Sequence, residues 1–495
     1  MAHNLMIQGT TSNAGKSVLC TALCRIFHQE GLRVAPFKSQ NMALNSFITQ
    51  EGLEMGRAQV TQAEAAGIAP SVRMNPILLK PTTDVGSQVI VNGVSRGNYR
   101  AKDYFRMKKT LIPHILEAYQ SLAEECDVIV IEGAGSPAEI NLKQEDIVNM
   151  GLAKLVDAPV LLVADIDPGG VFASLYGTVA LLEPEERARV KGLIINKFRG
   201  DVTILEPGLR MLEDLTGIPV VGVIPYMDLD LDDEDSLAQR FQKSEGGGEI
   251  DVAVIRLPRI SNFTDFNPIA RLPQVSLRYV RTAAALGAPD LAILPGTKST
   301  LSDLRWLKAT GLGEAIVRHA TAGGAVIGIC GGYQMLGHQV CDPLCAEGGG
   351  EESGLQLLPT HTVFDVEKTR TRVTGRVTGA EGIFAPLRDT PFFGYEIHMG
   401  QTETAGASFA ALSSGTQDGA VSGNVWGSYV HGIFDDGPFT AKLVNCLLSA
   451  KGLAPTAEPI LIDEYKEMQY NKLASIVRKH LDMERIWQLI GREPG

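Results

Sequence analysis

Several features of secreted, membrane and nucleic-acid-binding proteins are missing from this sequence. The seven cysteines are odd in number, scattered and never spaced as Cys-x-x-Cys, which argues against a disulfide framework or a zinc ribbon. The most apolar run, residues 158–166, is too short to cross a bilayer. No charged segment followed by an apolar stretch opens the chain, so we expect no signal peptide and a cytoplasmic location. Basic residues number 45 against 57 acidic ones, so we expect neither nucleic acid nor a membrane as partner.

The composition is that of an ordinary globular protein. Hydrophobic residues make up 44% and charged residues 21% of the 495 positions, which is enough for at least two cores. In the first half, short β-branched runs alternate with helical stretches, and several runs are apolar throughout, as in strands covered on both faces. This α/β pattern predicts a doubly wound, mainly parallel sheet. The expected strands are residues 4–9, 33–37, 127–131, 159–165, 192–196 and 219–224.

A domain boundary is expected where the composition changes. The acidic run at 228–235 is followed by SEGGGE at 244–249, which is typical of a flexible linker. A second α/β unit follows, with strands expected at 251–257, 275–280, 291–294, 325–329, 370–377 (antiparallel), 395–398 and 428–431. Residues 341–352 are expected to form a surface loop. The predicted organisation is a first domain at 1–243, a linker at 244–250, a second domain at 251–440 and a helical C-terminal extension at 441–495.

The first motif with chemical meaning is a glycine-containing loop between a strand and a helix. It reads Gly9-Thr10-Thr11-Ser12-Asn13-Ala14-Gly15-Lys16-Ser17, one residue longer between its glycines than the usual P-loop. Backbone N–H groups in such a loop bind phosphate oxygens, and the helix N-terminus adds a favourable dipole. Lys16 is therefore expected at the β- and γ-phosphates, and the Ser17 hydroxyl at Mg²⁺. The alternative is a plain glycine-rich turn before a helix.

Two further residues lie at predicted strand ends. Glu132 ends the buried run VIVIE, at the edge of a parallel sheet where ligands bind, so it is a candidate second Mg²⁺ ligand. The alternative is a solvated charge at a strand end. Asn196, at the end of GLIIN, is expected near the nucleotide base, although Asn-Lys is also common turn material.

This half of the chain resembles the dethiobiotin synthetase-like P-loop family, which has the same lengthened loop and an EGAG strand end. The resemblance implies that ATP and Mg²⁺ bind at residues 9–17 and Glu132. It also implies that Lys38 contacts phosphate or substrate, and that Glu54 is a further metal ligand.

The second motif is a thiol at a sharp turn. Cys330 lies in GICGGY, between a predicted strand and a predicted helix. The flanking glycines permit an exposed, strained elbow, and the following helix N-terminus favours the thiolate. The alternative is a buried structural cysteine. The backbone N–H groups of Gly296 and Gly331 are candidates for an oxyanion hole.

A nucleophilic thiol also needs a base, and the sequence offers two histidines. His431 follows a short predicted strand in YVHGIF. His398, in GYEIHMG, shares one strand face with Glu396, which is also a plausible catalytic arrangement. Periodicity alone does not choose between them.

This second half is similar to a class I glutamine amidotransferase domain, and the whole chain resembles the cobyric-acid-synthase (CobQ/CbiP) branch. The family-like stretches are PFKSQNMALN, GRAQVTQAEAAG, PTTDVGSQVI, ISNFTDF, LPGTKST, GICGGYQMLG, GYEIHMG and YVHGIF. By this resemblance Cys330 is the nucleophile and His431 its partner. Ile433 stands where most class I enzymes have the orienting glutamate, so the usual third residue is missing.

The resemblance implies a ligase that amidates the b, d, e and g carboxylates of adenosylcobyrinic acid a,c-diamide, using ATP, Mg²⁺ and L-glutamine. Asn41, Asn45 and Asp84 are candidate corrin contacts, although loop capping would use the same residue types. The alternatives are another glutamine-dependent amidase, such as cobyrinic acid a,c-diamide synthase or a cell-wall amidase, a non-catalytic corrinoid or nucleotide sensor, and a P-loop partitioning ATPase. No oligomeric state is predicted.

Overall fold

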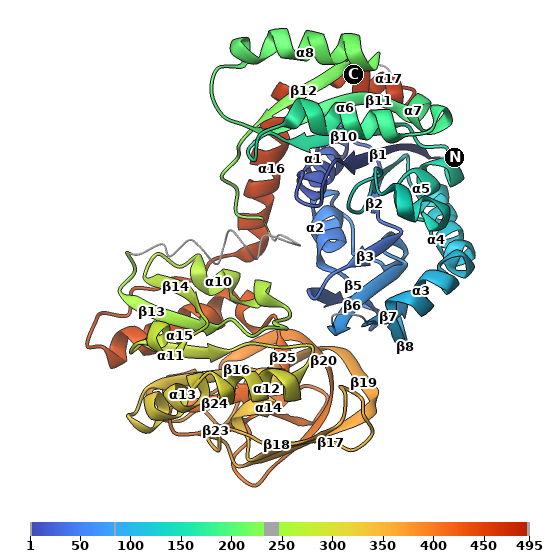
Figure 1. Ribbon diagram of the computed structural model, residues 1–495. Coiled ribbons are helices and arrows are strands. Elements are labelled where there is room, and N and C mark those ends of the chain that lie inside the picture. Colours follow the sequence, from blue (N-terminus) through green and yellow to red (C-terminus); the bar gives the residue numbers. More distant parts are fainter. Residues whose placement is uncertain (1, 84–85, 232–246, 493–495) are drawn as a thin grey trace.

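The computed structural model describes residues 2–83, 86–231 and 247–492, and it contains two α/β units (Figure 1). The predicted fold class, two mainly parallel sheets with a helical C-terminal segment, is confirmed. Asp84 and residues 232–246, which include the first three residues of the linker predicted at 244–250, lie outside the described residues. Within the described ranges no helix is long and apolar enough to cross a membrane.

The first domain is built on a six-stranded, fully parallel sheet in the order β12-β11-β10-β1-β9-β2. Every strand expected in this half is present, with ends shifted by a few residues at most. The strands are β1 (His3–Gly9), β2 (Val34–Phe37), β9 (Val128–Glu132), β10 (Val160–Asp165), β11 (Val190–Phe198) and β12 (Val220–Pro225).

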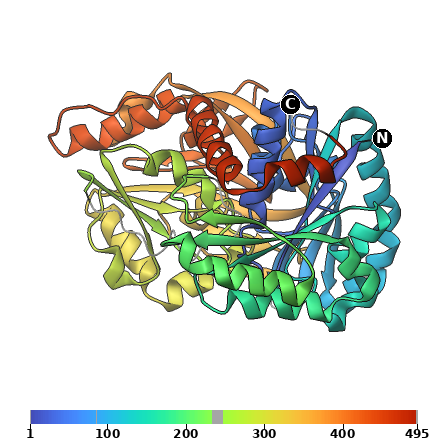
Figure 2. The same ribbon diagram turned by 90° about the horizontal axis from the view of Figure 1, so that it is seen from above.

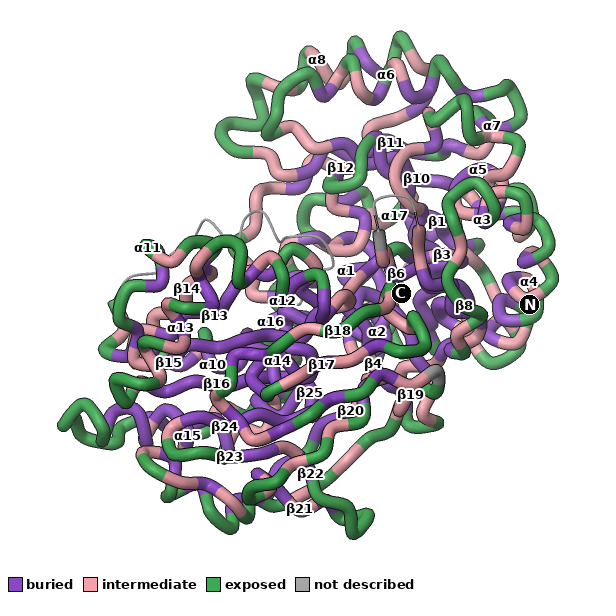
Figure 3. Tube along the Cα trace, turned by 60° about the horizontal axis from the view of Figure 1, so that its bottom comes forward, coloured by how far each residue is buried: buried purple, intermediate pink, exposed green. Residues whose placement is uncertain are grey.

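Both faces of this sheet are covered, which explains why its strands are apolar throughout. In β1, Leu5 and Ile7 pack into the core on one face, while Met6 between them packs into the core on the other. The helices of this half are α1 (Lys16–Gln29), α2 (Arg57–Ala65), α3 (Ala101–Met107), α4 (Ile112–Glu125), α5 (Met150–Leu155), α6 (Val171–Leu181), α7 (Pro184–Arg189) and α8 (Val202–Thr216). Figure 3 shows helices α6 and α8, which carry many exposed residues, beside the more deeply buried strands β10 and β11.

The end of the chain returns to the first domain. Helix α15 (Gly437–Ala450) packs in the second domain, but α16 (Ile462–His480) and α17 (Met483–Leu489) join the core beside α1 (Figures 1 and 2). The buried α16 residues of that contact are Tyr470, Leu473, Ala474 and Val477. The predicted helical extension therefore divides between the two domains.

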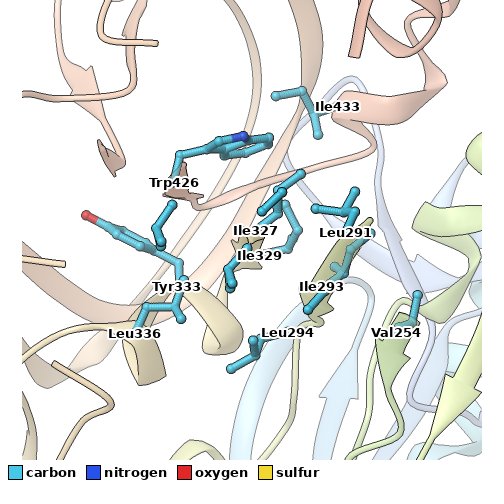
Figure 4. Packing of buried hydrophobic residues seen from close by; sticks show 14 of the residues in the cluster. Val254, Leu291, Ile293, Leu294, Ile327, Ile329, Tyr333, Leu336, Trp426 and Ile433 are labelled. Atoms are coloured by element: carbon cyan, nitrogen blue, oxygen red, sulfur yellow. The ribbon is translucent and has the colours of Figure 1, made fainter. Parts of the chain in front are cut away.

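The second domain contains a six-stranded sheet in the order β14-β13-β15-β16-β24-β23, parallel except for β23. Figure 4 shows its core, where Ile327 and Ile329 of β16 pack among Leu291, Ile293 and Trp426. The strands are β13 (Ile250–Ile255), β14 (Val275–Val280), β15 (Leu291–Leu294), β16 (Ala325–Ile329), β23 (Ala420–Ser422) and β24 (Val425–Ser428). Its helices include α10 (Asn267–Ala270), α11 (Ala283–Leu286), α12 (Thr300–Ala309), α13 (Leu312–Thr321) and α14 (Gly331–Leu336).

A second, mixed sheet lies in the same domain. The long strands β19 (Thr360–Val377) and β20 (Pro391–Thr404) pair antiparallel, as expected for residues 370–377. The sheet also contains β17 (Gln339–Asp342), β18 (Gly350–Ser353), β21 (Ala410–Leu412), β22 (Gln417–Asp418) and β25 (Val430–His431). The prediction of a loop over residues 341–352 is wrong at both ends, because β17 and β18 pair there as an antiparallel hairpin. Only the residues between these two strands form a loop.

Small strands of the first domain contact the second domain. Strands β3 (Gln40–Met42), β6 (Ile77–Thr83), β7 (Gly86–Val91) and β8 (Val94–Arg100) form one sheet, and β4 (Ser46–Ile48) pairs with β5 (Glu54–Gly56). Ile48 of β4 packs with Tyr395 and Ile397 of β20 in a separate apolar cluster. This contact brings the segment after β2 against the part of the second domain that carries Cys330 and His431.

Candidate active sites

The predicted phosphate loop connects β1 to α1 as expected. Gly15 is the N-cap of α1 and has φ 99°, a left-handed conformation that favours glycine. Lys16 curls back into the loop, where its Nζ donates to the carbonyl oxygens of Thr11 (2.9 Å), Ser12 (3.0 Å) and Gly135 (3.1 Å). Its ammonium group therefore lies inside the loop, the position that a triphosphate-binding lysine requires.

Asn196 closes one side of this loop. Its Nδ2 donates to the Ala14 carbonyl at 2.9 Å, and a Cβ on Gly15 would lie 2.0 Å from that nitrogen. Only glycine fits there. Within the described ranges the buried Oδ1 of Asn196 has no hydrogen-bond partner, so an acceptor remains open beside the loop. An open acceptor at this place suits an amino group of a nucleotide base.

The carboxylate of Glu132, at the end of β9, lies at the bottom of the same site. It accepts hydrogen bonds from Ser17 Oγ (2.8 Å), Lys38 Nζ (3.0 Å) and Gln62 Nε2 (2.5 Å). Burial alone would raise the pKa of Glu132, but the Lys38 ammonium and these hydrogen bonds hold the pKa below its usual value. The structure thus places Ser17, Lys38 and Gln62 around the ionised carboxylate of Glu132, and Ser17 follows directly on Lys16 of the loop.

These donors suit a nucleotide with its magnesium ion. The Ser17 hydroxyl and the Glu132 carboxylate are hard oxygen ligands held 2.8 Å apart, and Mg²⁺ in nucleotide sites takes few protein oxygens because phosphates and waters complete its shell. Among the described residues no group of three or more His, Cys, Asp or Glu side chains is placed to hold a metal.

Glu54, the other predicted metal ligand, has a different environment. Its Oε1 lies 2.8 Å from Lys80 Nζ and its Oε2 lies 2.6 Å from Lys368 Nζ, a residue of the second domain. Burial would raise its pKa, but the two ammonium groups hold the pKa of this carboxyl far below its usual range. Both oxygens therefore take part in a buried ion triad across the domain contact, and a metal-binding role for Glu54 stays a prediction.

The predicted corrin contacts are asparagines of the same region. Asn41 Nδ2 donates to Gln59 Oε1 at 3.2 Å, on the helix that also bears Gln62. Asn45 Oδ1 accepts from the backbone N–H of Phe263, in the second domain, at 3.2 Å. These two residues thus lie near the Glu132 site and at the domain contact, while Asp84 lies outside the described residues.

Cys330 occupies the turn between β16 and α14, with φ 51° and ψ −109°. This is a strained backbone for a residue with a side chain, as in a nucleophile elbow. The turn is tightly packed behind the thiol, because a Cβ on Gly332 would lie 2.0 Å from the Leu294 carbonyl oxygen. The glycine after the turn is therefore required, and the geometry agrees with the predicted elbow.

His431 rather than His398 has the environment of a catalytic base. Its Nδ1 lies 2.6 Å from Asp265 Oδ2, and both side chains are buried. Burial would lower the pKa of His431, but the Asp265 carboxylate and the neighbouring Cys330 raise it to about 10. His398 instead stacks on Tyr429, with ring centroids 3.7 Å apart, and burial lowers its pKa to about 4.

Asp265 is the residue that inspection of the sequence missed. Ile433, where the usual glutamate is absent, is fully buried and points into the core (Figure 4). Asp265, in the short 3₁₀ turn Phe263–Phe266, presents a carboxylate to His431 instead. Its Oδ1 also accepts the N–H of Gly432 at 3.3 Å. The only signal was its position in the ISNFTDF stretch, which gives no hint of a contact with His431.

The two predicted oxyanion-hole glycines lie next to the dyad. A Cβ on Gly296 would lie 2.8 Å from Cε1 of His431, and one on Gly331 would lie 2.7 Å from Cγ2 of Thr297. Gly331 is the first residue of α14, where N–H groups have no partner within the helix. Both backbones thus approach the site closely, as donors to an oxyanion must.

A pocket opens above Cys330 and His431. It is lined by residues of both domains: Lys80, Ser261, Asn262, Thr297, Lys298, Thr300, Cys330, Gln334, Glu347, Phe364, Lys368, Ile397, His398, Met399 and His431. Lys80 belongs to β6 of the first domain. The first domain therefore contributes to the wall of the thiol site.

Comparison with known proteins gives matches over nearly the whole chain. Residues 5–236 match the CobQ/CobB/MinD/ParA nucleotide binding domain, and residues 251–439 match the CobB/CobQ-like glutamine amidotransferase domain. The chain is 56% identical to the cobyric acid synthases of Ruminiclostridium cellulolyticum and Lachnoclostridium phytofermentans, covering 99% of this chain and 97% and 99% of theirs. It is 54% identical to the cobyric acid synthase of Photorhabdus laumondii, over 99% of this chain and 98% of that one.

Proposed function

This chain belongs to the cobyric acid synthase family, and we propose that it catalyses the ATP- and glutamine-dependent amidation of a corrinoid acid. The substrate is adenosylcobyrinic acid a,c-diamide, its b, d, e and g carboxylates are amidated, and the product is adenosylcobyric acid. The observation that supports the proposal is that one chain carries both a glycine-containing loop beside Glu132 and a strained cysteine turn in the domain that holds the buried His431–Asp265 pair.

At the thiol site, Cys330 Sγ attacks the side-chain amide carbon of glutamine. The N–H groups of Gly296 and Gly331 stabilise the oxyanion of the tetrahedral intermediate. His431 is protonated at neutral pH, holds the proton that the thiol has given up, and donates it to the departing nitrogen, so that ammonia leaves and a thioester remains. Asp265 holds the imidazole by Nδ1 throughout. Water then cleaves the thioester to give glutamate and the free thiol.

At the phosphate-loop site, ATP with Mg²⁺ supplies the phosphoryl group that turns a corrin carboxylate into an acyl phosphate. Lys16 offsets negative charge on the transferring group. Ser17 and Glu132 would hold the metal, and Lys38 keeps Glu132 ionised. Ammonia from the thiol site attacks the acyl carbon, and phosphate leaves in place of the poorer leaving group, oxide.

Two variants test this division of labour. Cys330→Ala is expected to lose amidation with glutamine and to retain amidation with added ammonia, because only the nitrogen source is removed. Lys16→Ala is expected to lose both. Amides added to the diamide are counted by mass spectrometry, alongside glutamate and ADP release. Glutamine-dependent activity in Cys330→Ala would contradict the role of the thiol, and either activity in Lys16→Ala would contradict the role of the loop.

The same assay also tests which acid the protein amidates. Incubation with the a,c-diamide, with cobyrinic acid and with a cell-wall lipid acid separates this reaction from those of cobyrinic acid a,c-diamide synthase and a cell-wall amidase. We expect amides to be added to the a,c-diamide only.

A further inference from the structure

Within the part of the chain that the structure describes, one lysine in the pocket above Cys330 forms no ion pair. Three lysines line this pocket, and two of them, Lys80 and Lys368, share the Glu54 carboxylate. Among the described residues no carboxylate lies within ion-pairing distance of the third, Lys298, and its ammonium group makes no hydrogen bond. An unpaired ammonium group beside a nucleophile is costly unless a ligand supplies the counter-charge.

The same pocket contains a carboxylate that forms no ion pair among the described residues. Glu347 lies in the loop between β17 and β18, and its Oε2 accepts the backbone N–H of Thr300 at 2.8 Å. It forms no ion pair with Lys298 in the described structure, although the two charges influence each other. Among the described residues the pocket therefore presents one positive and one negative group that form no ion pair, either with each other or with another side chain.

Hydrogen bonds to Asp342 fix the backbone of the loop that carries Glu347. Asp342, which is buried, accepts the backbone N–H groups of Ala346 (2.7 Å), Glu347 (2.7 Å) and Gly349 (2.8 Å). Three such hydrogen bonds fix the loop at the point where Glu347 leaves it. Lys298 follows Thr297 in the loop that also carries Gly296, so its backbone is fixed relative to the oxyanion site.

The chemistry of the nitrogen donor matches these two charges. When the amide group of glutamine is at Cys330, its α-carbon, with one carboxylate and one ammonium group, would lie farther from the thiol, among the other residues that line the same pocket. We propose that Lys298 binds the α-carboxylate of glutamine and Glu347 its α-ammonium group, so that this pair sets the preference for the amino acid over a simple amide. The inference rests on the proposed glutaminase function and assigns its substrate-binding residues.

Truncated amides test the two contacts separately. 4-Aminobutanamide lacks the α-carboxylate, and glutaramate lacks the α-ammonium group. Ammonia release from each, and from glutamine, is measured as kcat/KM. Lys298→Met is expected to lower kcat/KM for glutamine by about 10- to 100-fold through KM, and to leave that for 4-aminobutanamide unchanged. Glu347→Gln is expected to lower the value for glutamine in the same way and to leave that for glutaramate unchanged.

Matched variants exclude a general effect on the fold. Lys308→Met removes an exposed lysine of the neighbouring helix α12, which pairs with Glu352, and is expected to change none of the three rates. Lys298→Arg retains the positive charge and is expected to keep most of the preference for glutamine over 4-aminobutanamide. Equal losses on all three amides in Lys298→Met, or a loss of preference in Lys298→Arg as large as in Lys298→Met, would overturn the proposal.

A failure of the proposed glutaminase function would give a different result in the ammonia-release assay. Cys330→Ala is expected to release no ammonia from any of the three amides. Release in that variant would overturn the thiol mechanism itself, whereas unselective losses in Lys298→Met overturn only the assignment of Lys298 and Glu347.

Discussion

His431 Nδ1 and Asp265 Oδ2 lie 2.6 Å apart although 166 residues separate them in the chain. The contact fixes which nitrogen of the imidazole faces Cys330, and it stabilises the protonated ring. Asp265→Asn is expected to lower glutamine-dependent turnover by about 10²- to 10⁴-fold, the range typical of general acid–base catalysis. Glutamate release measures the loss. Ammonia-dependent amidation, carried out at the other site, should remain and shows that the variant is folded.

The same contact predicts a pH dependence. The pKa of His431 is raised to about 10, so the ring is protonated at neutral pH and loses its proton as the pH rises through that value. Removing the negative charge of Asp265 destabilises the imidazolium and lowers its pKa. The alkaline fall in glutamate release should therefore begin at a lower pH in Asp265→Asn than in the unaltered chain. An unchanged alkaline limb would mean that Asp265 does not control this proton.

Contacts from the first domain hold the turn that carries Asp265. Asn45 Oδ1 accepts the N–H of Phe263, the N–H of Ser46 donates to Asn262 Oδ1 at 3.0 Å, and the Tyr395 hydroxyl donates to the Ser46 carbonyl at 3.1 Å. The ring of Tyr395 also stacks on His431. The position of the base thus depends on the docking of the other domain.

Asn45→Ala is accordingly expected to slow glutamate release by about fivefold, the effect of losing one hydrogen bond of about 1 kcal/mol. Asn98→Ala, on the exposed strand β8, is the matched control and should have no effect. If Asn45 contacts the corrin, as the resemblance implies, the change will instead be a higher KM for the diamide with normal glutamate release.

Local sequence patterns predicted most of the fold, and they predicted the phosphate loop of one site and the cysteine turn of the other. Phosphate loops and thiol elbows are continuous in sequence, so the positions of Lys16, Ser17 and Cys330 could be recognised from their neighbours alone. Alternating apolar runs likewise predicted the parallel strands, because burial on both faces leaves a direct trace in composition. The strand expected at 428–431 is split between β24 and β25 because residue 429 leaves one sheet for the other.

Contacts between distant segments could not be predicted in this way. Asp265 reaches His431 only because the 3₁₀ turn at Phe263–Phe266 packs beside the end of β25, and nothing in either segment specifies the other. Glu347 lies in a stretch whose glycines and charges indicated only a surface loop, and its place in the pocket depends on the β17–β18 hairpin. A charged residue in a loop has the same local pattern whether it faces solvent or a ligand.

The ion triad of Glu54 with Lys80 and Lys368 gives a prediction about stability. Glu54→Gln would leave two buried ammonium groups without a counter-charge, and breaking a buried pair in this way costs about 3–5 kcal/mol. We expect a lower urea midpoint for the unfolding step that separates the domains. The double variant Glu54→Gln/Lys368→Met should recover part of the loss, because one of the two uncompensated charges is gone.

The pH dependence of unfolding distinguishes this structural role of Glu54 from metal binding. Its pKa is lowered in the folded chain, so its contribution to stability is present above the ordinary pKa of 4.5 and is lost as the pH falls below it. The difference in midpoint between the unaltered chain and Glu54→Gln should therefore be full at pH 7 and shrink on acidification. The difference in midpoint between the unaltered chain and Lys80→Met should likewise shrink on acidification, because Lys80 Nζ lies 2.8 Å from Glu54 Oε1. If Glu54→Gln instead unfolds normally and requires more Mg²⁺ for ATP hydrolysis, the carboxylate serves the metal and the triad contributes little to stability.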